Sequence, residues 1–241
     1  MLHKTRGIVL HSVRYSETSV IVKIYTELFG LQSYLFKGIR SKKSKTRPAL
    51  LQPLTLLAME VYHKQKNNIQ SAKEILIAYP YQHIPFDIRK SSIALFMNEL
   101  VYKSIREEES NPLLFRFLWQ TLLQLDTLEE NIGSFHLIFA MLLTRHLGIF
   151  PQDNFSDENN IFHLRDGNFQ AGIPQHPYFL DPQKSQSFYL LLSTPLELSG
   201  NISFNQDTRS ILLEAINTYY QFHLPGFKGL QSHHVLHSVL S

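Results

Sequence analysis

Apolar and polar residues alternate with a period of two through most of the first 80 positions. At positions 20–25, one side of the alternation holds Val20, Val22 and Ile24, and the other holds Ile21, Lys23 and Tyr25. Such alternation is typical of a half-buried β-strand. Five runs of this kind, rich in β-branched and aromatic residues, span residues 7–15, 18–26, 31–39, 54–63 and 69–79.

Short turns join most of these runs, so the five predicted strands belong to one small domain, residues 1–82. An OB-type (oligonucleotide-binding) β-barrel is the economical way to close five strands. A small β-sandwich or an SH3-like barrel has the same number of strands, and the pattern does not separate the three folds.

Beyond Pro80 and Pro85 the apolar period becomes that of a helix. Helical segments are predicted at residues 93–105, 111–128, 134–147, 185–193, 207–224 and 230–240. The predicted N-caps are Asn111, Ser134 and Asp207. The segment 134–147 is apolar nearly all round and is predicted to end at Gly148, so it belongs at the centre of a helical bundle.

Residues 151–183 are polar and irregular, and Asp166-Gly167 predicts a small hairpin within them. The whole chain is therefore predicted to be an α+β protein. An N-terminal five-stranded domain precedes a mainly α-helical domain, residues 83–241, which carries this short insertion.

Charge divides the chain at the same place. Residues 1–83 carry 13 Lys+Arg against 4 Asp+Glu, whereas residues 84–241 carry 10 against 16. The two net charges, +9 and −6, add up to the +3 of the whole chain. A strongly basic first module indicates a polyanionic partner.

The densest positive charge lies between the third and fourth predicted strands. Six Lys or Arg residues fall within 37–47, with no Asp or Glu among them. Such a run is often only a solvated loop, but here it belongs to a basic module whose predicted fold binds single strands with its sheet and loops. We predict a phosphate-binding set made of Arg14, Lys37, Arg40, Lys42, Lys43, Lys45 and Arg47.

Aromatic residues are interleaved with these cations, namely Tyr15, Tyr25, Tyr34, Phe36 and Tyr62. Cations along phosphates and aromatic rings under bases are what sequence-tolerant binding of single strands requires. Each ring taken alone is better explained as part of the core. We therefore expect only one or two of the five to face a nucleic acid.

No catalytic motif emerges from the sequence. The chain has no cysteine, which excludes thiol chemistry, disulfides and cysteine-ligated zinc and fits a reducing cytoplasm. P-loop, G-x-S-x-G, H-E-x-x-H and dinucleotide motifs are missing. His233 and His237 have the spacing of a metal-binding helical pair but no evident third ligand. We expect a non-enzymatic protein without cofactor or metal.

Neither a leader nor a membrane segment is expected. The first residues contain no sustained apolar core, and the longest apolar run, 137–143, is too short to span a bilayer.

Several motifs together resemble the RecO family of bacterial recombination and DNA-repair proteins. They are YSET at 15–18, KGIR at 37–40, LQP at 51–53, TRHLGIFP at 144–151 and HLPGFKGLQSHHVL at 223–236. Their order and spacing extend the resemblance over nearly the whole chain.

The resemblance implies an N-terminal OB barrel, a helical C-terminal domain and a non-enzymatic activity. Proteins of this family bind single- and double-stranded DNA and anneal complementary strands. With RecR, they help load the RecA recombinase onto DNA coated by single-strand binding protein (SSB). The helical domain of the family recognises the acidic, apolar-tipped C-terminal tail of SSB.

The chain departs from the family pattern in two places. Many members carry four cysteines after the central helix and bind structural zinc there, whereas residues 151–183 are expected to be a shortened, metal-free replacement. The central helix of some members supplies an arginine before a phenylalanine, where this chain has Ile138 before Phe139. Other cations are therefore expected to hold the SSB tail, and the candidates are Lys103, Arg116 and Arg145.

Two further classes of function remain open from the residues alone. One is a protein-interaction scaffold in which DNA contact is incidental, and the other is an OB-fold RNA-binding module. Both fit a basic five-stranded domain followed by helices.

Overall fold

The structure is a computed structural model that describes residues 1–39, 48–64, 66–106, 108–129, 131–232, 236 and 238–240. It forms two compact units. Unit 1 comprises residues 1–82 and 105–123, and unit 2 comprises residues 83–104 and 124–241. Unit 1 thus contains a second segment besides the predicted β-domain. The predicted domain boundary between residues 82 and 83 stays a prediction.

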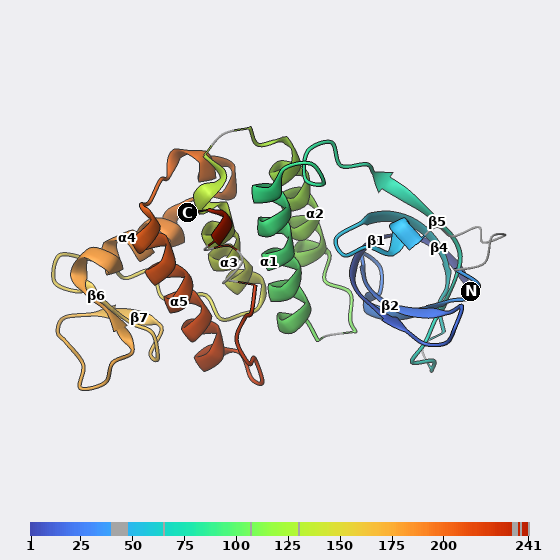
Figure 1. Cartoon of the computed structure of the whole chain (residues 1–241). Helices are drawn as coiled ribbons and strands as arrows, with labels where there is room; N and C mark the ends of the chain where they lie inside the picture. Colours follow the sequence, from blue (N-terminus) through green and yellow to red (C-terminus); the bar gives the residue numbers. More distant parts are fainter. Residues whose placement is uncertain are drawn as a thin grey trace. The chain divides into compact units, whose positions relative to one another are not determined.

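Unit 1 is built on an antiparallel sheet of five strands, which confirms the number predicted (Figure 1). The strands are β1 (Leu2–Arg14), β2 (Val20–Thr26), β3 (Gly30–Phe36), β4 (Leu56–Tyr62) and β5 (Ser71–Tyr79). Their order in the sheet is β3-β2-β1-β4-β5.

The edge strands of this sheet, β3 and β5, do not pair with each other along their described lengths, so the sheet is not closed. The edges approach at one point, where Gln70, just ahead of β5, forms a parallel bridge with Tyr34. Leu35 N donates to Gln70 O (3.1 Å), and Gln70 N donates to Ser33 O (2.8 Å). The fold is thus a curved sheet with one bridge between its edges.

One face of the sheet encloses an apolar core. Its buried members are Val9, Val22, Ile24, Tyr34, Phe36, Ile39, Leu51, Leu57, Met59, Val61 and Ile75. Val22 and Ile24 lie on the inner face, as the alternation predicted. Tyr25 lies on the opposite face but is only 1% exposed, because a helix covers it.

That helix is α2 (Pro112–Thr127), whose part up to Leu123 belongs to unit 1. The ring of Phe115 lies 6.2 Å from the ring of Tyr25. Arg6 on β1 donates two hydrogen bonds to Glu27 (2.9 and 2.6 Å), and its guanidinium carbon lies 4.9 Å from the Trp119 ring. The ring of Tyr25 on β2 and the side chain of Arg6 on β1 are thus covered by α2.

Unit 2 is mainly helical. Its helices are α1 (Ile88–Ser104), α3 (Phe135–His146), α4 (Pro182–Ser193) and α5 (Gln206–His223). Helix α3 packs against α1, α4 and α5, and nearly all of its residues are buried, which confirms the predicted central helix. Tyr220 on α5 donates its hydroxyl to the carbonyl oxygen of Ala140 (2.7 Å), which ties α5 to α3.

The helix ends follow the predictions with one correction. The side chain of Asn111 accepts a hydrogen bond from the backbone three residues on, so this N-cap is confirmed. Ser134 precedes α3, but its side chain makes no capping bond. Asp207 is wrong as the cap of α5, because Asn205 caps the helix two residues earlier and Asp207 lies in its first turn. Gly148, at φ +72°, follows the end of α3.

The insertion of unit 2 contains a three-stranded antiparallel sheet, hereafter the small sheet. Its strands are β6 (Ile161–His163), β7 (Asn168–Gln170) and β8 (Phe179–Leu180), in the order β7-β6-β8. The predicted hairpin is confirmed, with Gly167 at φ +73° in its turn. Strand β8 was not predicted, because a two-residue strand has no periodicity.

No helix within the described residues is long and apolar enough to cross a membrane. The predicted last helix, 230–240, includes positions that lie outside the described residues, and His233 and His237 are two of these positions.

Candidate functional site

The register of the sheet gathers the described cations of the predicted phosphate-binding set at one end of unit 1. Arg14, the last residue of β1, pairs with Val20 on β2, and Val20 pairs with Phe36, the last residue of β3. Lys37 follows Phe36 directly, and both cations are exposed. We call the end of the sheet that carries Arg14 and Lys37 the cationic end.

The segment rich in Lys and Arg leaves the sheet at the cationic end. Ile39 N donates to Thr18 O (2.9 Å), which fixes the chain after β3 beside the turn between β1 and β2. Ile39 and Leu51 are both 5% exposed and belong to the same core, so both flanks of the segment are anchored. The predicted members Arg40, Lys42, Lys43, Lys45 and Arg47 lie outside the described residues.

The cations of unit 1 differ in their partners. Away from the cationic end, Lys73 pairs with Glu60 at 2.8 Å, and Arg6 pairs with Glu27 at 2.6 Å. At the cationic end, neither Arg14 nor Lys37 forms an ion pair with a carboxylate among the described residues of unit 1.

Burial separates the five interleaved aromatic residues. Tyr25, Tyr34 and Phe36 are 1%, 0% and 6% exposed, so they belong to the interior. Tyr15 is 63% exposed and lies in the turn after Arg14. Tyr62 is 45% exposed, but it pairs with Leu2 at the opposite end of β1. Tyr15 is thus the exposed ring of this group at the cationic end.

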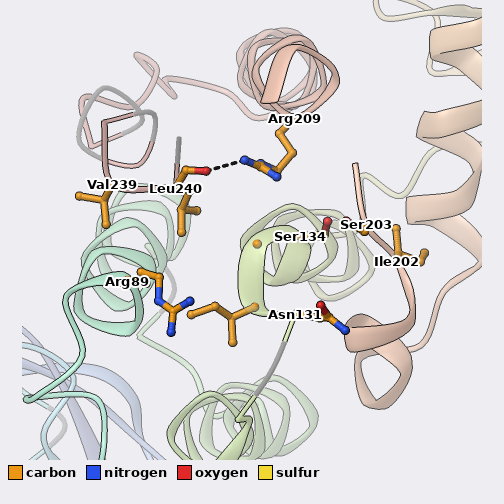
Figure 2. A pocket seen from close by; sticks show the side chains of 10 residues that line it. Arg89, Asn131, Ser134, Ile202, Ser203, Arg209, Val239 and Leu240 are labelled. Atoms are coloured by element: carbon orange, nitrogen blue, oxygen red, sulfur yellow. Dashed lines mark hydrogen bonds between the residues drawn. The ribbon is translucent and has the colours of Figure 1, made fainter. Parts of the chain in front are cut away.

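Unit 2 contains a pocket of about 320 Å³ (Figure 2). It is lined by Arg89, Asn131, Ile132, Gly133, Ser134, Ile202, Ser203, Arg209, Val239 and Leu240. Figure 2 shows that the two arginines reach the pocket from different helices, Arg89 from α1 and Arg209 from α5. Two permanent cations in one cavity suit a ligand that carries a carboxylate.

The two arginines of the pocket keep part of their donor capacity. Arg209 donates to the carbonyl oxygens of Phe204 (2.7 Å) and Leu240, and a guanidinium has five N–H groups. Arg89 donates to Asp87 at 3.2 Å, an exposed ion pair of the kind that contributes little to stability. Burial, assisted by the charge of Arg209, lowers the pKa of His136 to about 3, so this neighbour adds no positive charge at neutral pH.

The three cations predicted for the SSB tail do not line this pocket. Lys103 donates to Glu99 (2.6 Å) and to Gly229 O (2.7 Å), and Arg145 donates to Leu192 O (3.3 Å).

The third candidate, Arg116, lies on α2 in the part that belongs to unit 1. The pKa of Glu27 is lowered by its hydrogen bonds from Arg6 and, less strongly, by the charge of Arg116. The candidates therefore belong to separate parts of the molecule, each with contacts of its own.

The pocket arginines were missed because no local pattern marks them. Arg89 stands in the first turn of α1, and Arg209 stands more than a hundred positions later on α5. Only packing around the start of α3 brings both to one cavity.

Together, these features define a class of protein with a basic five-stranded β unit and a mainly helical unit. Comparison with protein families is more specific: residues 1–81 match the model "Recombination protein O N terminal", and residues 85–231 match "Recombination protein O C terminal". The chain belongs to the RecO family of DNA repair proteins.

Curated relatives named "DNA repair protein RecO" align with the chain over its full length. The relative from Phocaeicola vulgatus is 36% identical over 241 residues, which is 100% of both chains. The relative from Bacteroides fragilis is 38% identical over 237 residues, 98% of both chains, and that from Flavobacterium psychrophilum is 37% identical over 240 residues, 99% of both chains. The resemblance found in the sequence motifs is confirmed.

Proposed function

We propose that this protein is a non-enzymatic recombination mediator that binds single- and double-stranded DNA in the cytoplasm and anneals complementary strands. The observation that carries this proposal is the cationic end, where Arg14 and Lys37 flank the exit of the basic segment without carboxylate partners among the described residues of unit 1. The names of the relatives, all DNA repair proteins, support it.

Residues 1–82 are proposed to act as the DNA-binding domain, with a topology of the OB type. The bridge between Gln70 and Tyr34 supports this topology, because it joins the two edges of the curved sheet. Residues 83–241 are proposed as the domain that recruits protein partners.

Annealing has a simple electrostatic account in this arrangement. Two complementary strands repel each other through their phosphates, and a dense set of Lys and Arg side chains lowers this repulsion. Phosphate contacts carry no sequence information, so one surface can hold many different strands. The proposed contacts are made by Arg14, Lys37, Arg40, Lys42, Lys43, Lys45 and Arg47.

The test is a triple charge reversal, Lys42→Glu, Lys43→Glu and Lys45→Glu. Four to six phosphate contacts give a log–log salt slope of roughly −3 to −4 on single strands. We expect the triple variant to flatten this slope and to stop annealing, while its thermal midpoint stays near that of the wild type.

The matched control reverses three exposed lysines elsewhere, Lys64→Glu, Lys66→Glu and Lys228→Glu, and so changes the net charge equally. Equal loss of binding in both variants would mean that net charge, and not the basic segment, binds DNA. Preference for an RNA competitor over DNA of the same sequence would favour the RNA-binding alternative.

The C-terminal tail of SSB is proposed to occupy the pocket between Arg89 and Arg209. The tail is acidic with an apolar tip, and the pocket offers two guanidinium groups beside the apolar side chains of Ile132, Ile202 and Val239. Bidentate pairing of a guanidinium with a carboxylate fits this chemistry.

Titration of a fluorescent SSB-tail peptide tests the pocket. Arg89→Glu is expected to weaken binding at least tenfold, because it replaces an attraction by a repulsion and leaves the packing of Arg209 intact. Arg116→Glu, in unit 1, is the matched control and is expected to bind normally. If instead Arg116→Glu or Arg145→Glu removes binding and Arg89→Glu does not, the tail binds elsewhere.

RecR is proposed as the partner with which the protein loads RecA onto SSB-coated strands. Gel filtration with the cognate RecR and SSB in high salt, where DNA binding is lost, separates the roles. Complexes that persist in the charge-reversed triple variant, together with normal RecA loading, would favour the scaffold alternative.

A further inference from the structure

The small sheet of unit 2 brings together three side chains that bind metals well in other proteins. His163 ends β6, Asp166 lies in the turn of the hairpin, and His176 lies in the segment that leads to β8. One ligand atom of each lies within 4.8 Å of the corresponding atoms of the other two. Nothing in the proposed function uses these residues.

We propose that His163, Asp166 and His176 bind one zinc ion, with water as the fourth ligand. Two imidazoles and a carboxylate form a donor set that zinc accepts, in tetrahedral geometry. With bonds of about 2.0 Å, ligand atoms of such a site lie roughly 3.3 Å apart. His163 Nδ1 and Asp166 Oδ2 are already 3.5 Å apart.

The surroundings of His163 select the nitrogen that binds the metal. Its Nε2 lies 3.2 Å from the carbonyl oxygen of Gly172, and a carbonyl can only accept, so Nε2 carries the proton. The lone pair is therefore on Nδ1, the atom that faces Asp166. A ligating histidine that donates its other N–H to a backbone carbonyl is the usual arrangement in metal sites.

Asp166 is oriented in a similar way. Its Oδ2 accepts a hydrogen bond from the side chain of Gln170 on the partner strand of the hairpin (2.9 Å). Carboxylates that ligate a metal are commonly held by hydrogen bonds of this kind.

His176 has to adjust for binding. Its Nδ1 accepts a long hydrogen bond, 3.2 Å, from the backbone N–H of Tyr178, and this bond is exchanged for the metal. An approach of up to about 1.5 Å toward the other two ligands completes the site. Pro174 and Pro177 flank the histidine and limit the conformations of this segment, which lowers the entropy lost when the metal orders it.

The physical role of the zinc is a cross-link within the small sheet. Strands β6 and β7 have three residues each and β8 has two, so the sheet contributes few hydrogen bonds of its own. A metal joins the hairpin to the segment before β8 and supplies the order that such short strands lack.

The experiment is a zinc titration of the full chain after removal of metal with EDTA, in competition with a chromophoric zinc indicator. We expect one zinc per chain in the wild type and affinity lower by on the order of 100-fold in Asp166→Asn and in His176→Ala. Both of these residues are more exposed than His163, so replacing them is expected to disturb the packing less than replacing His163 would. His83→Ala, which removes an exposed histidine outside the site, is the matched control and is expected to bind like the wild type.

A second measurement is the thermal midpoint with and without zinc. Zinc is expected to raise it in the wild type and in His83→Ala but not in His176→Ala. Absence of zinc binding in the wild type would overturn the proposal. Loss of binding in a His233→Ala, His237→Ala double variant, with binding retained in Asp166→Asn, would overturn it as well.

Discussion

Glu99 on α1 holds the segment that follows α5, and its replacement by Gln is a sharp test of the packing in unit 2. The carboxylate accepts hydrogen bonds from Lys103 Nζ (2.6 Å), from Gln231 N (2.9 Å) and from Ser232 N (2.7 Å). Lys103 also donates to Gly229 O (2.7 Å). Glu99→Gln removes the charge and turns half of the acceptor group into a donor that faces other donors.

The magnitude follows from the pKa of Glu99. Burial raises this pKa, but the hydrogen bonds from Lys103, Ser232 and Gln231 outweigh burial and bring it from 4.5 to about 2. A difference of this size corresponds to at most about 3 kcal/mol of stability at neutral pH. Because the side chain keeps 17% exposure to solvent, which screens the charge, we expect a loss of about 2 kcal/mol in Glu99→Gln.

The dependence on pH has a definite sign. A carboxyl group whose pKa is lowered in the folded state stabilises the protein above pH 4.5, and this stabilisation is lost as the pH falls toward 2. At pH 3 the group is almost fully protonated in the unfolded chain but still mostly ionised in the folded protein. More than half of the stabilisation by ionised Glu99 is therefore lost at pH 3, and the free energy of unfolding of the variant should be closer to that of the wild type than at pH 7.

Urea denaturation at pH 7 and pH 3 measures both effects. When the free energy of unfolding of Glu99→Gln is subtracted from that of the wild type, the contributions of all other carboxylates to the pH dependence cancel. Glu214→Gln, an exposed change on α5, is the control and should stay within about 0.5 kcal/mol of the wild type. This account would be refuted if the free energies of unfolding of the wild type and Glu99→Gln differed by less than about 0.5 kcal/mol at pH 7. It would also be refuted if their difference were not smaller at pH 3 than at pH 7.

Two further predictions concern unit 1. Gly30→Ala should lower the free energy of unfolding by about 2 kcal/mol or more, because φ is +63° and the added methyl group would overlap the carbonyl oxygen of Glu109. Gly148→Ala, at φ +72° in open space, should lower it by only about 1 kcal/mol, and thermal denaturation of both variants measures the difference. Tyr15→Ala should weaken binding of single-stranded DNA about tenfold in a fluorescence titration, whereas Tyr62→Ala should have no effect; equal losses would contradict the assignment of the cationic end.

The candidate sites were predictable to different degrees. The basic segment is visible in the sequence because its charges are neighbours along the chain. The pocket of Arg89 and Arg209 is not visible, since its lining comes from α1, from the residues around the start of α3, from α5 and from the C-terminal residues. The metal-binding group is equally hidden, because His176 follows His163 by an irregular segment whose path no local pattern describes.

Local patterns along the chain predicted the kinds of element and their order, and composition showed the charge of each module. These depend on local periodicity and on composition, which is why five strands, a central apolar helix and a basic first module were all predicted. The family could be recognised for a similar reason, since its motifs are short and continuous in the chain.

Which distant side chains meet depends on how the helices and strands pack in three dimensions. Tyr25 looked like an outer-face residue of a strand and became buried because α2, some ninety residues later, packs against that face. Arg89 and Arg209 share a cavity, and His163, Asp166 and His176 converge, for the same reason. Contacts of this kind depend on how whole elements pack, and a period of two or 3.6 residues carries no information about that packing.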